Sequence, residues 1–337
     1  MDAAPALRGA VIGLGMMGGH HARILQQHHS LSLAGAVDPV GDVHRAIADP
    51  RLLHGSVAAL LASSPRPDFA VVATPTDEHA AVAAELITAG VPVLVEKPLA
   101  GSVADAQELI DAVAAAGVRA AVGHVERFNP ALIALRERIV RGDLGEIFLI
   151  ASERLGPFPH RVRDIGVVKD LATHDLDLVG WLGGSPVQRV SAETQHRMGR
   201  EHEDLLLAHG RLADGRAFQC SVDWLTPTKV RRTRVLGERG MLVADTLTAD
   251  LTFYANADVP TGGWAAVQQL RGVAEGDMTR YALERREPLA AELEAFAAFV
   301  AGDDDAPVVS LDAGLATMRV AEACLESAAR GETVRVS

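Results

Sequence analysis

Residues 7–23 read LRGAVIGLGMMGGHHAR, an apolar run that leads through a glycine-rich turn into a helical pattern over about Met17 to His28. The turn has the form G-x-G-x-x-G and consists of Gly13, Leu14, Gly15, Met16, Met17 and Gly18. Its first glycine permits a tight turn, the second lets a pyrophosphate approach the backbone, and the third lets helix and strand pack closely. Because the helix N-terminus would face the phosphates, the stretch predicts a dinucleotide-binding βαβ unit.

An acidic residue, Asp38, ends the next apolar run, Leu31 to Val37. A carboxylate at the end of the second strand can hold the ribose hydroxyls of a dinucleotide and would repel a 2′-phosphate. We therefore expect NAD as the cofactor, with NADP less favoured. The alternative is that Asp38 only starts a turn before Pro39.

The pattern of alternating strands and helices continues to about residue 123. The expected further strands are Asp68 to Ala73, Val91 to Val95 and Val118 to Val122, and the expected helices are Glu78 to Ala89 and Val103 to Ala116. Strands that alternate with helices of this length predict a doubly wound parallel sheet. We assign residues 1–123 to an NAD-binding Rossmann domain.

After about Gly123 the pattern changes to strands that follow one another without helices, which predicts a large, mostly antiparallel open sheet. The expected strands are 146–153, 187–194, 203–212, 216–223, 229–237, 241–245 and 247–254, and the expected helices are 130–141, 170–182, 287–300 and 311–330. We assign residues 124–337 to an α+β domain.

The length and composition agree with two soluble domains. The chain has 337 residues, of which 48% are hydrophobic and 23% charged, and roughly 150 residues make a domain. The net charge of −12 argues against nucleic-acid partners and anionic membranes. Two cysteines, Cys220 and Cys324, make no disulfide framework, which favours a cytoplasmic setting. The sequence shows neither a signal peptide nor an apolar run long enough to span a bilayer.

Lys97 stands in the motif Val95-Glu96-Lys97-Pro98 at the expected end of a parallel strand, where ligands bind in such folds. It is one of only three lysines among 32 basic residues, and a lysine can donate or hold a proton where arginine cannot. The alternatives are an ion pair with Glu96 and a lysine that survives by chance. The Lys97–Pro98 bond could be cis.

Asp170 and His174 are four residues apart, which places them on one face of a helix. A carboxylate beside an imidazole orients the ring and raises its basicity, as a general base for an alcohol requires. The alternative is an N-cap aspartate followed by a surface histidine. The other histidines form no set with metal-ligand spacing, so we expect no catalytic metal.

The chain resembles the Gfo/Idh/MocA family, the glucose–fructose oxidoreductase and inositol dehydrogenase group, nearly end to end. The stretches that carry the resemblance are 13–23 (GLGMMGGHHAR), 73–80 (ATPTDEHA), 95–100 (VEKPLA), 122–130 (VGHVERFNP), 166–182 (GVVKDLATHDLDLVGWL), 223–232 (DWLTPTKVRR) and 312–328 (DAGLATMRVAEACLESA). The resemblance implies that Lys97, Asp170 and His174 form the catalytic set. It also implies cofactor contacts from Gly13, Gly15, Met16, Met17, Gly18, Asp38, Thr74, Pro75, His79, Glu96 and Lys97.

The same resemblance implies an NAD(P)-dependent oxidoreductase acting on a secondary alcohol or ketone of a sugar. The stretches 122–130 and 166–182 are similar to those of the branch that acts at C3 of nucleotide sugars such as UDP-N-acetylglucosamine. Candidate substrate-binding residues are Arg127, Phe128, Asn129, Arg163, Lys229 and Arg231. The alternatives are an inositol, free-sugar or sugar-phosphate dehydrogenase, and a non-catalytic NAD-binding regulator. The family also implies that residues 124–337 serve substrate binding and oligomerisation, with a homo-oligomer, a dimer or tetramer, formed through the second-domain sheet. It further implies that the final helix, about 311–330, packs back on the first domain.

Overall fold

The computed structural model describes residues 7–159, 162, 165–257 and 274–336. The chain divides into two compact units. The first contains Met1–Val125 and Leu289–Met318, and the second contains Glu126–Pro288 and Arg319–Ser337. The first unit therefore includes a segment from the part of the chain that the sequence assigns to the second domain.

The first unit is built on a six-stranded parallel sheet with the strand order β3-β2-β1-β4-β5-β6. The strands are β1 (Leu7–Ile12), β2 (Leu31–Val37), β3 (Leu53–His54), β4 (Phe69–Val72), β5 (Val93–Glu96) and β6 (Ala120–Gly123). The strand order reverses between β1 and β4, and in such sheets ligands bind beyond the carboxyl ends of the strands at this point. The predicted doubly wound parallel sheet is confirmed.

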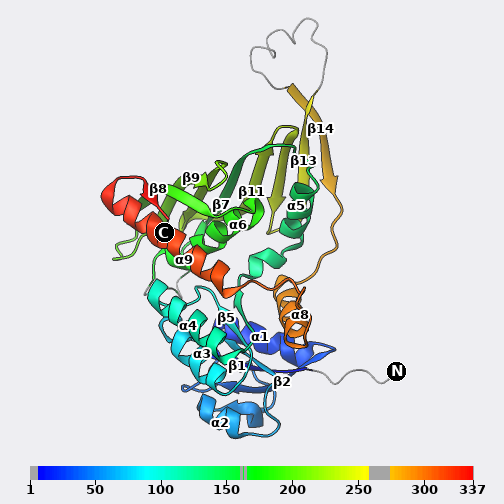
Figure 1. The fold of residues 1–337 in the computed structure, drawn as a ribbon, viewed down its shortest axis with the longest axis vertical. Coiled ribbons are helices and arrows are strands. Elements are labelled where there is room, and N and C mark those ends of the chain that lie inside the picture. Colours follow the sequence, from blue (N-terminus) through cyan, green and yellow to red (C-terminus); the bar gives the residue numbers. More distant parts are fainter. Residues whose placement is uncertain (1–6, 160–161, 163–164, 258–273, 337) are drawn as a thin grey trace, which may run out of the picture. The chain divides into compact units, whose positions relative to one another are not determined.

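Helices pack around this sheet (Figure 1). They are α1 (Met16–Gln27), α2 (Val57–Ala62), α3 (His79–Thr88), α4 (Val103–Ala116), α8 (Pro288–Val300) and the first part of α9 (Leu311–Arg330), with the short 3₁₀ turns η1 (Pro50–Leu52) and η2 (Thr76–Glu78). Leu293 and Phe296 of α8 join Leu25 of α1 and Phe69 of β4 in one buried apolar cluster. Burial of these side chains fixes α1, and with it the glycine-rich turn, against the sheet.

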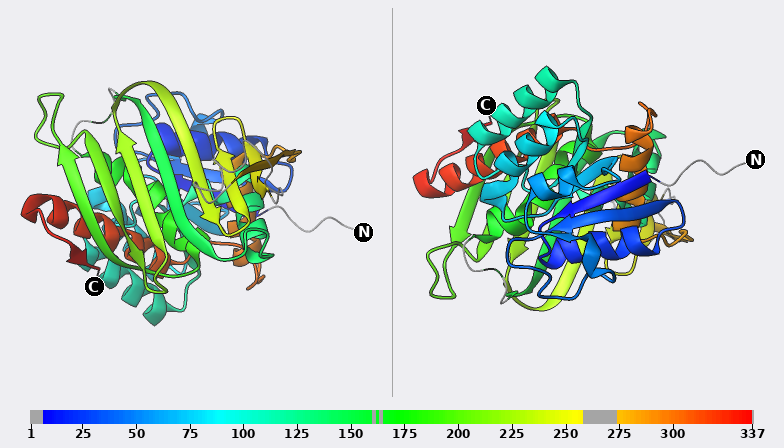
Figure 2. Two further views of the ribbon diagram at one scale, coloured as in Figure 1. Left: turned by 90° about the horizontal axis from the view of Figure 1, so that it is seen from above. Right: turned by 90° about the horizontal axis from the view of Figure 1, so that it is seen from below.

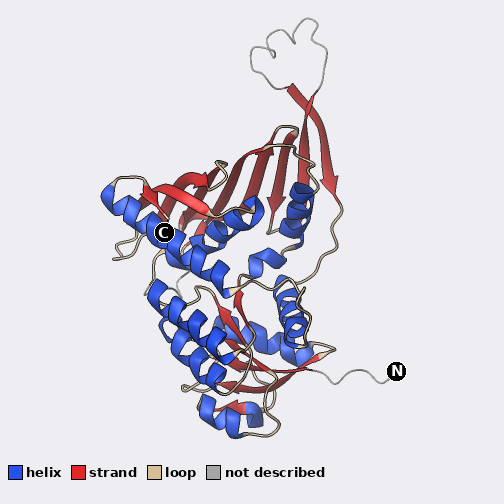
Figure 3. Cartoon of the chain, viewed as in Figure 1, coloured by secondary structure: helices blue, strands red, loops and turns tan. Residues whose placement is uncertain are grey.

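The second unit is built on a nine-stranded sheet with the order β14-β13-β12-β11-β7-β10-β9-β8-β15. The strands are β7 (Ile147–Pro157), β8 (Val187–Gln195), β9 (Leu205–Leu212), β10 (Ala217–Asp223), β11 (Leu225–Gly237), β12 (Gly240–Asp245), β13 (Asp250–Ala257), β14 (Ala274–Tyr281) and β15 (Val334–Arg335). Only the β7–β10 pair is parallel. The predicted mostly antiparallel sheet is confirmed, and Figure 3 shows successive strands here in contrast to the alternating elements of the first unit.

One face of this second sheet carries helices, and the other carries none from the described part of the chain (Figure 2, left). The helical elements are η3 (Val125–Phe128), where the chain passes from the first unit to the second, α5 (Pro130–Val140), η4 (Val168–Ala172), α6 (Thr173–Gly183) and the second part of α9. Val320 and Cys324 of α9 and Leu176 of α6 are buried with Ile150 and Val235 of the sheet. The core of the second unit therefore lies between these helices and the inner face of the sheet.

Six elements and one turn type were not foreseen. The stretches that the sequence left unassigned contain strand β3, helix α2, the 3₁₀ turns η1 and η3, and strands β14 and β15. Residues Val168–Ala172 form a π-helical turn, where a regular helix over 170–182 is predicted. Cys220 and Cys324 are free and buried. None of the helices among the described residues is long and apolar enough to cross a bilayer.

Candidate functional site

The glycine-rich turn after β1 depends on two of its three glycines. Gly13 has φ +90°, and a Cβ there would come within 2.6 Å of the Ala73 carbonyl oxygen. A Cβ on Gly18 would come within 1.8 Å of the Gly13 carbonyl oxygen. Only glycine can therefore let β1, its turn and α1 approach one another this closely.

The third glycine, Gly15, faces open space. It precedes α1 as its N-cap, no side chain caps that end, and the first turn contains no acidic residue. A Cβ on Gly15 would meet no atom within 4 Å, and the next side chain, Met16, is exposed. The uncapped backbone amides at the start of α1 thus fit the pyrophosphate of a dinucleotide.

Asp38 lies at the carboxyl end of β2, beside this turn. One carboxylate oxygen accepts a hydrogen bond from the Leu14 amide (2.9 Å) and the other accepts one from the Val40 amide (2.9 Å). Asp38 therefore does shape the turns on both sides of it, as the alternative interpretation expected. Each oxygen has a second lone pair that can accept a ribose hydroxyl, and that contact stays a prediction.

His79 joins the loop after β4 to the loop after β5. Its Nδ1 lies 2.9 Å from the Pro98 carbonyl oxygen, and its Nε2 lies 3.0 Å from that of Thr74. The ring is 2% exposed, and burial lowers the pKa of His79. The structure thus uses His79 to hold the Thr74–Pro75 loop and the Lys97–Pro98 turn together, while its predicted contact with the cofactor stays a prediction.

Glu96 and Lys97 end β5 at the same edge of the sheet. The buried Glu96 carboxylate lies 2.8 Å from Nε2 of the buried His21, and accepts a hydrogen bond from the Lys97 amide (3.2 Å). Burial opposes ionisation of Glu96, but His21 and Lys97 outweigh it and lower the pKa of Glu96. Glu96 therefore links the backbone of Lys97 to α1, the helix that follows the glycine-rich turn. The Lys97–Pro98 bond is cis, as the sequence suggested.

A second buried acid in the first unit has no counterpart in the sequence analysis. Glu292 of α8 is 2% exposed, and neither carboxyl oxygen has a hydrogen-bond partner among the described residues. Burial and the charge of Glu96 raise the pKa of Glu292 well above its usual range. Glu292 lies on an alanine-rich helix far along the chain, so no local motif marks it.

Asp170 and His174 belong to the second unit, on the helical segment formed by η4 and α6. Asp170 lies in the π turn and its amide donates to the Gly166 carbonyl oxygen (3.1 Å). His174 lies in the first turn of α6, and both side chains are half-buried. The two residues thus share one helical segment, as predicted. The turn between them begins as a π-helical turn, which is wider than the α-helical turn that the sequence predicted.

Two further aspartates of α6 hold this helix in place. Asp177 receives two hydrogen bonds from Arg127, at 2.7 and 2.6 Å. Asp175 receives one from the buried Arg154 at 2.5 Å, and Arg154 also donates to Glu126 at 2.8 Å. These pairs join residues far apart in the sequence, so spacing could not have revealed them.

The candidate substrate residues Arg127, Phe128 and Asn129 have other contacts within the second unit. Arg127 pairs with Asp177, Phe128 is buried, and Asn129 caps α5 by accepting from the Ala131 amide (3.0 Å). Their predicted contact with a substrate stays a prediction. Arg163 lies outside the described residues.

Lys229 and Arg231 lie together on β11. A Cβ added to Gly156 of β7 would have both side chains within 4 Å. Arg231 donates to the carbonyl oxygens of Leu155 and Val230. Burial and the charge of Arg154 lower the pKa of Arg231. Neither Lys229 nor Arg231 forms an ion pair with an acid in the part of the chain that the structure describes.

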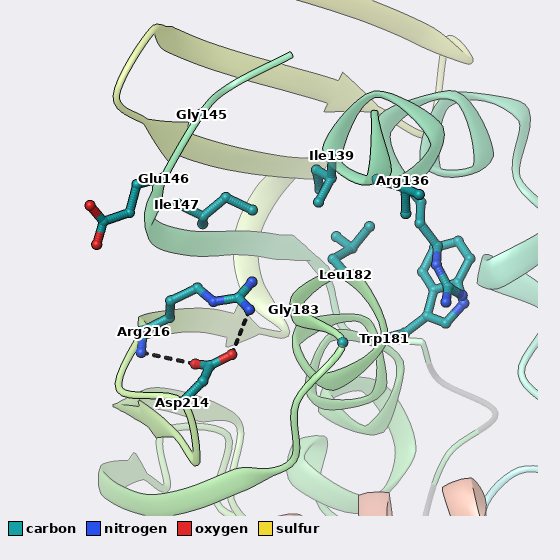
Figure 4. A pocket seen from close by; sticks show the side chains of 12 residues that line it. Arg136, Ile139, Gly145, Glu146, Ile147, Trp181, Leu182, Gly183, Asp214 and Arg216 are labelled. Carbon is teal, nitrogen blue, oxygen red and sulfur yellow. Dashed lines mark hydrogen bonds and ion pairs between the residues drawn. The ribbon is translucent and has the colours of Figure 1, made fainter. Parts of the chain in front are cut away.

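A pocket of about 560 Å³ lies at the other end of α6 (Figure 4). Its floor includes Leu182 and its two sides carry Arg136, stacked on Trp181 at 4.6 Å, and Arg216, paired with Asp214 at 2.5 Å. No predicted catalytic residue lines it. We therefore place the candidate catalytic residues elsewhere: Lys97 just after β5, Asp170 in η4 and His174 at the start of α6.

Two family models match most of the chain. Residues 7–124 match the model described as the oxidoreductase family with an NAD-binding Rossmann fold, and residues 132–243 match the GFO/IDH/MocA C-terminal domain. The UDP-N-acetylglucosamine 3-dehydrogenase of Acidithiobacillus ferrooxidans is 31% identical over 86% of this chain and 87% of its own length. The inositol 2-dehydrogenase 1 of Saccharopolyspora erythraea is 30% identical over 98% of this chain and 96% of its own.

A solved structure gives the same result. That of the A. ferrooxidans UDP-N-acetylglucosamine 3-dehydrogenase has a TM-score of 0.81 and 28% identity, and the match covers 96% of this chain and 98% of that one. The uncapped start of α1 and the glycines around it fit the dinucleotide that the first family model describes. The chain therefore belongs to the Gfo/Idh/MocA family of oxidoreductases, with an NAD-binding Rossmann domain in its first unit.

Proposed function

We propose that this oxidoreductase transfers a hydride between NAD and a secondary alcohol or ketone at C3 of a nucleotide sugar, of which UDP-N-acetylglucosamine is the first candidate. The similarity to a dehydrogenase of that sugar over most of both chains favours it. Inositol dehydrogenases are nearly as similar, so identity alone does not separate a charged substrate from an uncharged one.

The observation that carries the choice is the pair of cations Lys229 and Arg231. They lie side by side next to Gly156, and neither forms a direct ion pair with an acid among the described residues. The charges of Asp175, Glu126 and Asp223 act on Arg231 from a distance, and Asp175 of α6 is the neighbour of His174. Two cations that no carboxylate binds directly, one of them within range of α6, suit a diphosphate, whereas inositol offers them no charge.

In this proposal the chain's own residues move the proton of the alcohol. His174 takes that proton in oxidation and returns it in reduction, and Asp170 orients the imidazole. The ammonium of Lys97 stabilises the developing negative charge on the same oxygen or relays its proton. The nicotinamide, when bound, accepts or supplies the hydride. Orientation of the two reactants supplies a large share of the acceleration.

The test is a substrate panel with the purified protein and NAD. We expect oxidation of UDP-N-acetylglucosamine, detected as NADH absorbance, with a higher kcat/KM than myo-inositol or free N-acetylglucosamine. Replacing Lys229 and Arg231 together by methionine should raise KM for the UDP-sugar and leave KM for NAD unchanged. Faster oxidation of inositol than of any UDP-sugar would instead establish the inositol dehydrogenase alternative. Tight NAD binding without turnover of any sugar or polyol would favour the regulator.

NAD rather than NADP is the proposed cofactor because Asp38 places a carboxylate at the end of β2. Replacing Asp38 by asparagine removes the charge but keeps an oxygen that can accept one of its two backbone hydrogen bonds. We expect the ratio of kcat/KM for NADP to that for NAD to rise at least about tenfold, because like-charge contacts cost several kcal/mol. Asp42→Asn is the matched control. Like Asp38, the Asp42 carboxylate accepts hydrogen bonds from two backbone amides, here those of Ala46 and Ile47, but it does not follow β2 directly. An unchanged ratio in Asp38→Asn would refute the assignment.

A homo-oligomer formed through the helix-free face of the second sheet also stays a proposal, as does a cytoplasmic location. Exposed apolar side chains on strands whose neighbouring residues are buried support the first: Phe148 on β7, Leu207 on β9 and Leu236 on β11. A bare sheet face with such side chains is suited to a second copy of the chain.

A further inference from the structure

The loop between β8 and β9, residues 196–204, holds the start of the helical segment that carries Asp170 and His174. A carboxylate oxygen of Glu203 accepts a hydrogen bond from the Val168 amide (3.0 Å), and the Glu203 carbonyl oxygen accepts one from the Val167 amide (3.0 Å). Arg200 donates to the Ile165 carbonyl oxygen at 2.5 Å. The loop thus contacts the chain at three points just before Asp170.

Gly166 has no side chain because Glu203 occupies that space. A Cβ on Gly166 would lie 1.9 Å from a carboxylate oxygen of Glu203, and all three of the nearest atoms belong to that carboxyl group. The backbone of Gly166 is outside the left-handed region, so its conformation does not itself require glycine. The close approach of Glu203 is therefore the tightest constraint on a side chain at this position.

The β8–β9 loop is itself well anchored. Glu203 is 8% exposed and the neighbouring Asp204 is fully buried. The Asp204 carboxylate accepts hydrogen bonds from the backbone amides of Arg197 and Met198, at 2.8 Å each. The guanidinium of Arg200 lies 5.1 Å from the centre of the Trp224 ring. A loop held in this way can impose a conformation on the segment that it contacts.

The conformation that needs imposing is the π turn Val168–Ala172. Such wide turns are rare and occur mostly at functional positions, because a regular α-helix is the more stable alternative. A carboxylate at the start of a helix is favoured by the unpaired amides and by the helix dipole. Glu203 supplies that carboxylate to Val168, the first residue of the π turn.

We propose that Glu203 is a positioning residue for the proposed dehydrogenase reaction: its carboxylate, admitted beside Gly166, fixes the π turn and so places Asp170 relative to His174. This inference rests on the proposed function. It assigns to Glu203 no contact with substrate or cofactor.

Four variants test it: Glu203→Ala, Glu203→Gln, Gly166→Ala and the Glu203→Ala/Gly166→Ala double variant. A displacement of about 1 Å at a reacting group can cost about 10²-fold in rate, so we expect kcat to fall by about that factor in Glu203→Ala and in Gly166→Ala. KM for NAD and for the sugar should change little. Glu203→Gln should recover most of kcat, because its amide oxygen can still accept from the Val168 amide.

The double variant distinguishes one shared structural defect from two independent ones. Once the carboxylate is gone, a methyl group at position 166 meets none of the three atoms that excluded it. We therefore expect the double variant to be no slower than Glu203→Ala, whereas two independent defects would multiply.

Amide hydrogen exchange at residues 167–172 gives a readout that does not depend on the substrate. Exchange should be faster in Glu203→Ala and Gly166→Ala than in the wild type and in Glu203→Gln. If the wild type turns over no sugar or polyol, the proposed function fails, and the exchange arm still tests the link between Glu203 and the π turn. Wild-type kcat in Glu203→Ala would overturn the proposal. Equal loss of kcat in Glu203→Ala and Glu203→Gln would overturn it too.

Discussion

Replacing His174 by alanine is expected to lower kcat with the accepted sugar by about 10²- to 10⁴-fold, the range that a positioned general acid–base group contributes. His174 is half-buried in the first turn of α6, on the same helical segment as Asp170. The glycine-rich turn that fits the dinucleotide lies in the other compact unit. We therefore expect the dissociation constant for NAD, measured by fluorescence titration, to stay near the wild-type value.

Replacing Lys97 by methionine should have an effect of similar size, and the pH dependence of kcat/KM separates the two roles. If Lys97 is the group that exchanges the proton, Lys97→Arg will not restore activity, because a guanidinium does not lose its proton near neutral pH. If Lys97 only stabilises charge and His174 exchanges the proton, Lys97→Arg should recover a substantial part of kcat. For oxidation, the acidic limb of the profile, where His174 becomes protonated, should then persist in that variant, and the basic limb, where Lys97 loses its proton, should disappear.

Matched controls keep these effects specific to the chemistry. His29 is an exposed histidine of the first unit, and Lys169 stands one position before Asp170. His29→Ala and Lys169→Met should both retain kcat. Wild-type turnover in His174→Ala and in Lys97→Met, with the controls also unchanged, would show that neither residue takes part in the reaction.

The parts of the fold that the sequence predicted well are those that depend on local patterns. Strand β2 and helix α4 begin and end at the predicted residues. Helix α4 has the Ser102 side chain as its N-cap, and Gly117 ends it in the left-handed conformation. Periodicity, caps and glycines act within a few residues of one another, so a single sequence carries them in full.

The parts that could not be predicted depend on contacts between distant residues. Strand β3 has two residues and exists because it pairs with β2, and β15 exists because it pairs with β8. The π turn at Asp170 accompanies the contact of Val168 with Glu203, 35 positions away. For the candidate site, the motifs indicated Lys97, Asp170 and His174, but the residues that hold them, His79, Glu96 and Glu203, act through tertiary contacts that spacing does not encode.

Replacing Arg154 by methionine is expected to lower the free energy of unfolding of the second unit by about 3–5 kcal/mol, because it leaves the carboxylate of Asp175 buried without its partner. Arg154 is 5% exposed and Asp175 is buried. Despite the cost of burial, the charges of Asp175 and Glu126 raise the pKa of Arg154 above its usual value. The guanidinium is therefore charged throughout the range in which the protein can be assayed. Burial raises the pKa of Asp175 even beside Arg154, so the loss of stability in Arg154→Met should be largest at neutral and higher pH, where Asp175 cannot escape its charge by taking up a proton.

The measurement is urea denaturation followed by tryptophan fluorescence, which reports on the second unit because Trp181 and Trp224 both lie there. The pair Arg280–Asp250 in the same unit, whose arginine side chain is 64% exposed, is the matched control. Arg280→Met should leave the stability nearly unchanged, because exposed ion pairs contribute little.

The double variant Arg154→Met/Asp175→Leu distinguishes a buried charge from a lost contact. Once both charges are removed, the apolar side chains fill the space without the buried carboxylate of Asp175, and much of the lost stability should return, although Glu126 still lacks its arginine partner. If the double variant is less stable than Arg154→Met alone, Asp175 stabilises the fold through another contact, and the penalty of an unpaired Asp175 is not the main term. Because Asp175 is the neighbour of His174 on α6, we also expect Arg154→Met to lower kcat at urea concentrations below the denaturation midpoint. The loss of kcat should exceed the fraction of unfolded protein, because the helix that carries His174 is held less firmly.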